Sequence, residues 1–320
     1  MRKKIIAFAL FFLCWSLIPE NRNLFPEQRL TQEEWACQYL EKGEIDKAIE
    51  ILEKELKISP QNLNTRLYMG IAFYLKKNLE IAFKEFEKIE KEIDKMLGAS
   101  DTFGDQAMFI QLGMERKASV LFSEEKKGLF YFFRGLTLKE KNDLKNAQKK
   151  FKEARKFHYD NTNLFLELID LCMKKKDLNS ARAELAEYRK SSGETPIFFF
   201  LDGWIKYEND EIEASLAALE KIAGSVPEAG ENRGRILYNS GDYKKAIEIW
   251  EEILLQNPEN KEVQTNLGYA YFLLGDQVKA QEYLGKAGVK ISPEKHTPKK
   301  IPLNSNFPFK ERKFDLQCKK

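Results

Sequence analysis

The sequence predicts an all-α fold, a solenoid of antiparallel helix pairs, from three observations. A small residue, usually Gly, is followed twelve positions later by Ala, as in Gly70 with Ala82 and Gly268 with Ala280. Most of these pairs recur about every 34 residues, the signature of stacked helical hairpins. The 320 residues are rich in Lys, Glu, Leu, Ile and Ala and poor in Gly and Pro, as expected of helices throughout.

The spacing divides the chain into seven repeat units. With the small residue at position 8, the units start near Arg29, Leu63, Gly128, Thr162, Pro196, Pro227 and Lys261. Each unit should contain a first helix, a polar turn such as residues 240–242 that ends it and caps the next, and a second helix. We expect the small residues to face each other where the two helices cross, because larger side chains would push the backbones apart.

Three departures from the pattern carry structural expectations. Ile169 replaces the Gly of one unit, and Ser215 replaces the Ala of another. The step from Pro196 to Pro227 is shorter than the usual period, so we expect the helix after Pro227 to be frayed or curtailed. Residues 97–127 break the phase and are either a degenerate repeat or an insertion that closes over the groove. We favour the degenerate repeat because long structureless loops are uncommon in compact arrays.

In these features the chain resembles the tetratricopeptide repeat (TPR) family. The best copies span residues 63–94, with Gly70, Ala82 and Phe86, and residues 261–292, with Gly268 and Ala280. The resemblance covers repeats at 29–96 and 128–293, and several copies in one phase are a stronger signal than any single copy. It implies a right-handed superhelix whose first helices line a concave groove that binds a partner protein or peptide.

The resemblance also implies which side chains face that groove. Carrying the family's groove positions onto this sequence gives Leu67, Ile71, Tyr74, Phe132, Phe200, Trp204, Tyr207, Arg235, Tyr238, Tyr269 and Phe272. The set is mostly aromatic, and aromatic side chains are enriched in binding hot spots. We therefore predict that a hydrophobic or amphipathic segment binds there. The alternative is that individual members only pack between units.

The N-terminus has the layout of a signal peptide. Basic residues 2–4 precede an apolar run over residues 5–18, which is shorter than the about 20 apolar residues of a membrane span. We predict that residues 1–18 are a signal peptide cleaved after Ser16 or, alternatively, an uncleaved anchor. Lipidation at Cys14 is disfavoured because the bulky Leu13 precedes it. The expected location is a bacterial periplasm or envelope.

The composition argues against catalysis and nucleic-acid binding. The two histidines, His158 and His296, lie beside a repeat boundary and in the tail, which disfavours a catalytic triad or a multi-histidine metal site. No phosphate-binding glycine loop is present. We predict a protein that is not an enzyme and has no cofactor or metal. The net charge of +3 gives no overall field that would attract nucleic acid.

The cysteines are widely separated and indicate neither a zinc site nor a disulfide framework. We expect Cys37 and Cys172 to be buried free thiols in first helices. The alternative, in an oxidising compartment, is that a disulfide forms.

Residues 294–320 form a tail of different chemistry. It contains eight basic and three acidic side chains and three prolines, and by itself it should be disordered. We expect a solvated tail, with contact to anionic lipid or an acidic partner as the alternative.

The sequence thus predicts an exported scaffold that binds a protein or peptide in its groove. The alternative is a structural component of an envelope assembly, anchored by its N-terminus and without a separable ligand. A groove filled by residues 97–127 or by the tail would favour this structural or autoinhibited alternative, whereas an open apolar groove would favour the scaffold.

Overall fold

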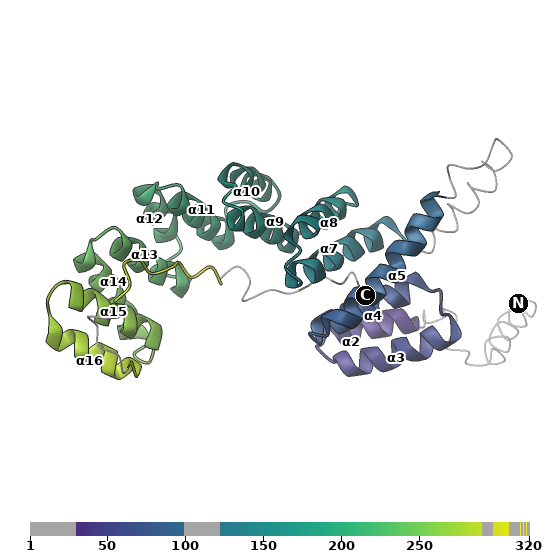
Figure 1. Ribbon diagram of the computed structural model, residues 1–320, viewed down its shortest axis with the longest axis horizontal. Coiled ribbons are helices and arrows are strands. Elements are labelled where there is room, and N and C mark those ends of the chain that lie inside the picture. The colour runs from purple at the N-terminus through teal and green to yellow at the C-terminus, as the bar shows by residue number, and fades with distance from the viewer. Residues whose placement is uncertain are drawn as a thin grey trace, which may run out of the picture.

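The computed structural model describes residues 30–98, 122–289 and 297–306 and the single residues 314, 316 and 318. Within that part of the chain, all regular structure is helical, and the helices pair into seven antiparallel hairpins stacked in an elongated arch (Figure 1). Each described helix packs against the described helix that follows it in the chain. The chain is therefore a helical solenoid.

The helices have the following bounds. The first helices of the hairpins are α2 (Gln32–Glu41), α4 (Leu63–Leu75), α7 (Glu124–Glu140), α9 (Thr162–Lys174), α11 (Pro196–Glu208), α13 (Pro227–Asn239) and α15 (Lys261–Leu273). The second helices are α3 (Ile45–Ile58), α5 (Leu79–Gly98), α8 (Leu144–Lys156), α10 (Leu178–Ser192), α12 (Ile212–Glu220), α14 (Tyr243–Gln256) and α16 (Gln277–Ala287).

The turn inside each hairpin has a left-handed residue at one fixed repeat position. The residues with positive φ there are Gly43, Lys77, Asn142, Lys176, Asp210, Gly241 and Gly275. In several units the next residue is an Asp that caps the second helix, as Asp242 does by accepting from the Lys245 N–H. Because the first helix stops and the second starts at a constant offset, the repeats keep one register.

The small residue at position 8 packs against a large side chain sixteen residues later. A Cβ added to Gly70 would lie 2.9 Å from Cδ1 of the buried Phe86 ring, and one on Gly268 would lie 2.5 Å from Cγ of Leu284. The sequence predicted the Ala twelve positions later as the facing residue. At Gly268 that alanine is a more distant neighbour than Leu284: the backbone oxygen of Ala280 lies 3.2 Å from the added Cβ.

The expectation of a frayed helix after Pro227 is wrong. α13 is continuous over 13 residues, and Pro227 stands in its first turn, where the missing N–H costs no helical hydrogen bond. The preceding helix, α12, is the short one with 9 residues, and it absorbs the shortened period. Ser215 fits the α11–α12 crossing because its hydroxyl is fully buried and donates to the Gly203 carbonyl at 2.7 Å.

Ion pairs link neighbouring hairpins. Lys139 of α7 lies 2.6 Å from Glu167 and 2.5 Å from Asp170, both buried on α9. Burial by itself lowers the pKa of Lys139, but these two carboxylates outweigh it and leave the pKa above the ordinary lysine value. The ammonium therefore stays charged at neutral pH.

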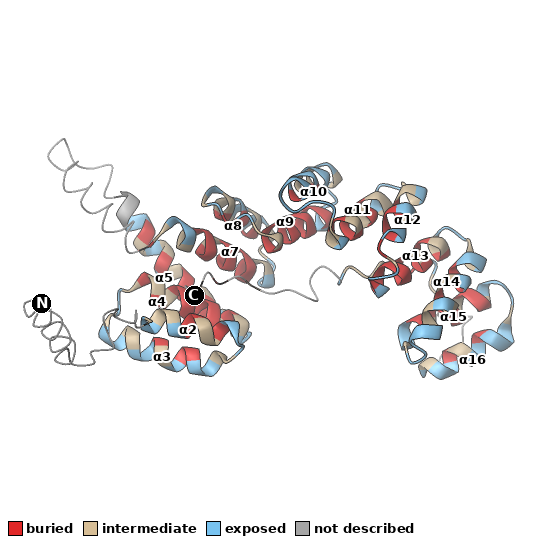
Figure 2. Ribbon diagram, turned by 180° about the vertical axis from the view of Figure 1, so that it is seen from behind, coloured by how far each residue is buried: buried red, intermediate tan, exposed pale blue. Residues whose placement is uncertain are grey.

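Buried side chains concentrate where helices meet, and most second helices expose their outer face (Figure 2). No described helix is both long enough and apolar enough to cross a membrane. The predicted signal peptide or anchor at 1–18 lies outside the described residues, as do residues 99–121 of the predicted degenerate repeat or insertion. The predicted segment ran over residues 97–127, and α7 begins inside it at Glu124.

Candidate functional site

The described residues of the C-terminal tail lie on the inner face of the arch. Residues 297–306 run past α13, and Phe314, Leu316 and Cys318 lie against helices α2, α4 and α7 at the other end (Figure 1). We call the surface of α2, α4, α7, α11 and α13 that contacts these residues the tail groove. Ile301 and Leu316 are buried. This differs from the solvated tail that its composition predicts.

Two asparagines of α13 hold the tail by its backbone. Asn239 Oδ1 accepts from the Ile301 N–H at 2.7 Å, and its Nδ2 donates to the Ile301 carbonyl at 2.8 Å. Asn232 makes the same pair of bonds with Asn304, at 2.7 and 2.9 Å. The asparagines are two helical turns apart, about 10 Å, and three residues of extended polyproline-like chain cover about 9 Å. The matched lengths let an extended segment lie along the helix.

Other side chains fix these asparagines in place. Arg235 is fully buried, donates to Asn232 Oδ1 at 2.9 Å, and is held in turn by Glu262 of α15 at 2.6 Å. Asn239 also donates to the Tyr207 hydroxyl of α11 at 2.7 Å. Side chains from three consecutive repeats therefore orient these amides.

A tyrosine adds a further bond to the tail backbone. The Tyr238 hydroxyl donates to the Pro298 carbonyl at 2.7 Å. Burial, and secondarily the neighbouring Tyr243 and Tyr269, raise the pKa of Tyr238 far above its ordinary value. The hydroxyl therefore stays protonated and remains a donor at physiological pH.

The other end of the tail groove is aromatic. The Phe314 ring lies 5.2 Å from Phe133, 6.2 Å from Phe132 and 6.4 Å from Tyr74, measured between ring centroids. Leu316 enters the core formed by the first repeats, with 1% of its surface exposed. This end recognises the tail mainly by apolar burial, whereas α13 recognises it by backbone hydrogen bonds.

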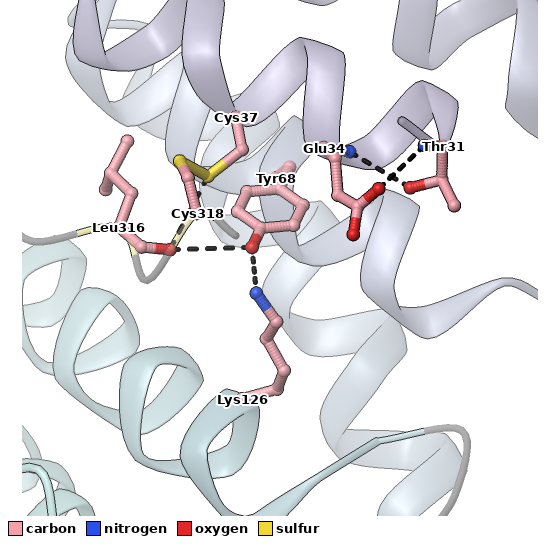
Figure 3. The surroundings of a disulfide bond; sticks show 7 residues. All are labelled: Thr31, Glu34, Cys37, Tyr68, Lys126, Leu316 and Cys318. Carbon is pink, nitrogen blue, oxygen red and sulfur yellow. Dashed lines mark hydrogen bonds between the residues drawn. A yellow bond between two sulfur atoms is a disulfide. The ribbon is translucent and has the colours of Figure 1, made fainter. Parts of the chain in front are cut away.

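A disulfide closes the site. Cys318 is bonded to Cys37 of α2, 281 residues earlier, and their Cα atoms are 5.7 Å apart, within the usual span of a disulfide. Figure 3 shows Leu316 beside the bond, its carbonyl accepting from the Tyr68 hydroxyl at 3.4 Å. The expectation of a free thiol is confirmed at the buried Cys172 and wrong at Cys37, which finds a partner in the tail.

A cavity of about 620 Å³ remains beside the tail between α11 and α13. Trp204, Tyr207 and Asn239 line it on the helix side, and Ile301 and Leu303 line it on the tail side. Among the described residues, no cluster of three or more His, Cys, Asp or Glu could hold a metal ion.

The predicted groove residues fall into three groups. Tyr74, Phe132, Tyr207 and Tyr238 contact the tail or the asparagine that binds it, and Trp204 lines the cavity. The second group lies deeper: Leu67 and Ile71 are fully buried in the core, Phe200 packs against the α12–α13 core, and Arg235 supports Asn232. The third group, Tyr269 and Phe272, is half-buried and packs against the cluster that contains Ile301.

The sequence-based predictions omitted the two residues that hydrogen-bond to the tail backbone on both its N–H and its carbonyl. Asn232 and Asn239 are seven residues apart, a spacing that puts both on one face of a helix, and this signal could have found them. The pairing of Cys37 with Cys318 has no local signal, because the two residues are at opposite ends of the chain.

Comparison with known protein families identifies two parts of the repeat array. The tetratricopeptide repeat family matches residues 36–62 and 231–295. BBSome complex member BBS4 of Bos taurus is 46% identical over 52 residues, which are 16% of this chain and 10% of that protein. The match thus covers about a tenth of the length of this curated relative.

Two solved structures resemble most of the arch. The C-terminal part of a TPR repeat-containing protein from Cytophaga hutchinsonii has a TM-score of 0.55 and 16% identity, over 80% of this chain and 93% of that one. A chain of the APC/C hetero-tetramer Cut9–Hcn1 has a TM-score of 0.53 and 14% identity, over 80% and 45%. At these identities the likeness shows the fold, an all-α superhelix of helix pairs.

Proposed function

Because this chain is a tetratricopeptide-repeat protein, we propose that it is an exported scaffold whose tail groove binds an extended segment of a partner protein. One observation carries the proposal. The groove already holds an extended segment, its own tail, by the backbone of Ile301 and Asn304. A surface with paired donors and acceptors for a peptide backbone is a peptide-binding surface, whichever chain supplies the peptide.

The geometry favours a class of segment over one fixed sequence. The hydrogen bonds of Asn232 and Asn239 to the tail involve its backbone atoms, so they require two free N–H groups three residues apart in an extended chain. Pro302, between the two contacts, holds φ near its extended value. Ile301 adds the burial of one apolar side chain. The partner segment should therefore be extended, with an apolar residue at the first contact.

Two features support export. The N-terminal basic and apolar runs have the order of a signal peptide. The Cys37–Cys318 disulfide is of a kind that persists in oxidising compartments such as the bacterial periplasm. We assign membrane contact, in the anchored alternative, to the N-terminal run, because residues 297–306 of the tail are engaged by α13.

One observation favours the structural alternative. The described tail residues occupy both ends of the groove, and Cys318 is covalently fixed there, as expected of an envelope component that has no separable ligand. The scaffold proposal requires the groove to bind a peptide from another chain, whereas the structural alternative does not.

A peptide-binding measurement separates them. The full chain with Ile301→Pro loses the N–H that Asn239 accepts, which weakens the tail's hold on α13. A fluorescent peptide of residues 297–306 should bind this variant saturably in an anisotropy titration. Binding should disappear when Asn239→Ala is added, and the peptide with Ile301→Pro should not bind. No binding to the folded Ile301→Pro variant, either with its disulfide intact or after reduction, would overturn the scaffold proposal and leave the structural one.

A further inference from the structure

We propose that the tail is a removable occupant of the tail groove and that the Cys37–Cys318 disulfide is a latch, so that a dithiol reductant opens the groove to an external segment. The inference rests on the proposed function, because it concerns the regulation of the same site. The observation behind it is that groove residues bind a segment of their own chain at both ends of the site.

The contacts at the two ends differ in reversibility. At α13 the tail is held by hydrogen bonds to Asn232, Asn239 and Tyr238, which break and reform quickly. At α2 it is held by a covalent bond. With the bond intact the tail is tethered at both ends, and an external peptide meets a competitor that cannot leave. With the bond open, one tether remains and the tail can move away.

The two cysteine residues are unequally exposed. Cys37 has 0% of its surface exposed, whereas Cys318 is only half-buried. The thiolate of a dithiol reductant would therefore attack Cys318 Sγ, forming a mixed disulfide and releasing Cys37 as a thiolate that takes up a proton. The second thiol of the reductant then attacks the mixed disulfide and releases Cys318. Two electrons pass from the dithiol, which becomes a disulfide, and the protein gains two thiols.

After reduction, the binding site for the tail is still present. Cys37 Sγ lies 3.6 Å from the Leu316 carbonyl oxygen, and as a thiol it could donate a weak hydrogen bond there. Phe314 and Leu316 still have their apolar pockets. Reduction therefore changes a fixed occupant into a competing one. A partner segment displaces it when it repeats the tail's pattern: an apolar residue, a proline, a free amide three residues after the first contact, and an aromatic side chain for the α4–α7 pocket.

Peptide binding under controlled redox conditions tests the latch. The probe is a fluorescent peptide of residues 297–318 carrying Cys318→Ser, titrated into four full-length proteins: oxidised wild type, wild type reduced with a dithiol, Cys318→Ser, and Cys172→Ala. Cys172→Ala is the matched control, because it removes the free buried thiol and keeps the disulfide.

The expected result is at least tenfold tighter binding to reduced wild type and to Cys318→Ser than to oxidised wild type. Cys172→Ala should follow wild type in both redox states. Equal affinity for the oxidised protein and Cys318→Ser would overturn the latch and leave the peptide groove standing. No binding to any of the proteins, nor to the Ile301→Pro variant, would overturn the groove and the latch together.

Discussion

Adding one methyl group at Gly234 should destabilise the C-terminal repeats, whereas adding one at Gly230, on the same helix, should not. A Cβ at Gly234 would lie 2.7 Å from Trp250 Cδ1 and closer still to the indole nitrogen. Trp250 is fully buried, and its Nε1 donates to the Glu231 carbonyl at 3.3 Å. A Cβ at Gly230 would meet only the Ile253 side chain, whose nearest atom, Cδ1, would lie at an ordinary 3.4 Å.

The size of the effect follows from opposing contributions. Alanine is favoured over glycine inside a helix by about 1 kcal/mol at either position. At Gly234, overpacking against the rigid indole costs roughly 1–3 kcal/mol, and displacing the ring also loses a hydrogen bond worth about 1 kcal/mol. The net expectation is a loss of about 2 kcal/mol for Gly234→Ala and a gain of up to about 1 kcal/mol for Gly230→Ala.

Amide hydrogen exchange is the suitable assay, because repeat arrays open unit by unit and one global transition need not describe them. Protection of the α13 and α14 amides should fall roughly 30-fold in Gly234→Ala and hold or rise in Gly230→Ala, since 1.4 kcal/mol is a factor of ten. Equal protection in the two variants would refute the idea that position 8 is kept small by the side chain sixteen residues later.

Three further outcomes are expected. Cys318→Ser should lower the free energy of unfolding by about 2–4 kcal/mol in urea denaturation, because it reopens a loop closed across 281 residues, and addition of dithiol to wild type should have the same effect. Asn239→Ala should speed exchange of the Ile301 amide about tenfold through the loss of two backbone bonds, whereas Ser240→Ala, whose hydroxyl bonds only Ile236 in its own helix, should leave that exchange unchanged. Partial burial alone would raise the pKa of Glu90, but Lys150 at 2.6 Å and Arg134 at 3.2 Å hold it below its ordinary value. The carboxylate therefore stabilises the fold above the ordinary glutamate pKa, and the destabilisation by Glu90→Gln at pH 7, about 1 kcal/mol, should shrink as the pH falls below 4; a constant difference would exclude the ion pair as its cause.

The groove positions came from the resemblance to the tetratricopeptide repeat family. They include Tyr74, Phe132, Tyr207 and Tyr238, which lie at or beside the tail contacts. The same resemblance placed Leu67 and Ile71 in the groove, although they are fully buried. A repeat position specifies the side of a helix, but whether a side chain there is covered depends on the size of its neighbours in the next repeat.

The occupant of the groove could not be predicted in the same way. The tail's basic and proline-rich composition indicates disorder for an isolated segment, because such a segment buries too little apolar surface to offset its loss of conformational entropy. Against α13 the balance changes: Ile301 is buried, and the amides of Asn232 and Asn239 are already oriented by Arg235 and Tyr207. The surface that orders the tail belongs to repeats far from it in sequence.

By itself, the sequence determined the class of fold and, for the described helices, their pairing and order. These properties depend on residues within one repeat, so their spacing records them. Only the tertiary structure decided that the groove holds the chain's own tail, that two asparagines read its backbone, and that Cys37 meets Cys318. The asparagine contacts join residues 62 to 72 positions apart, and the disulfide joins residues 281 positions apart. No single repeat contains both partners of such a contact, so only the stacking of the described hairpins into an arch brings them together.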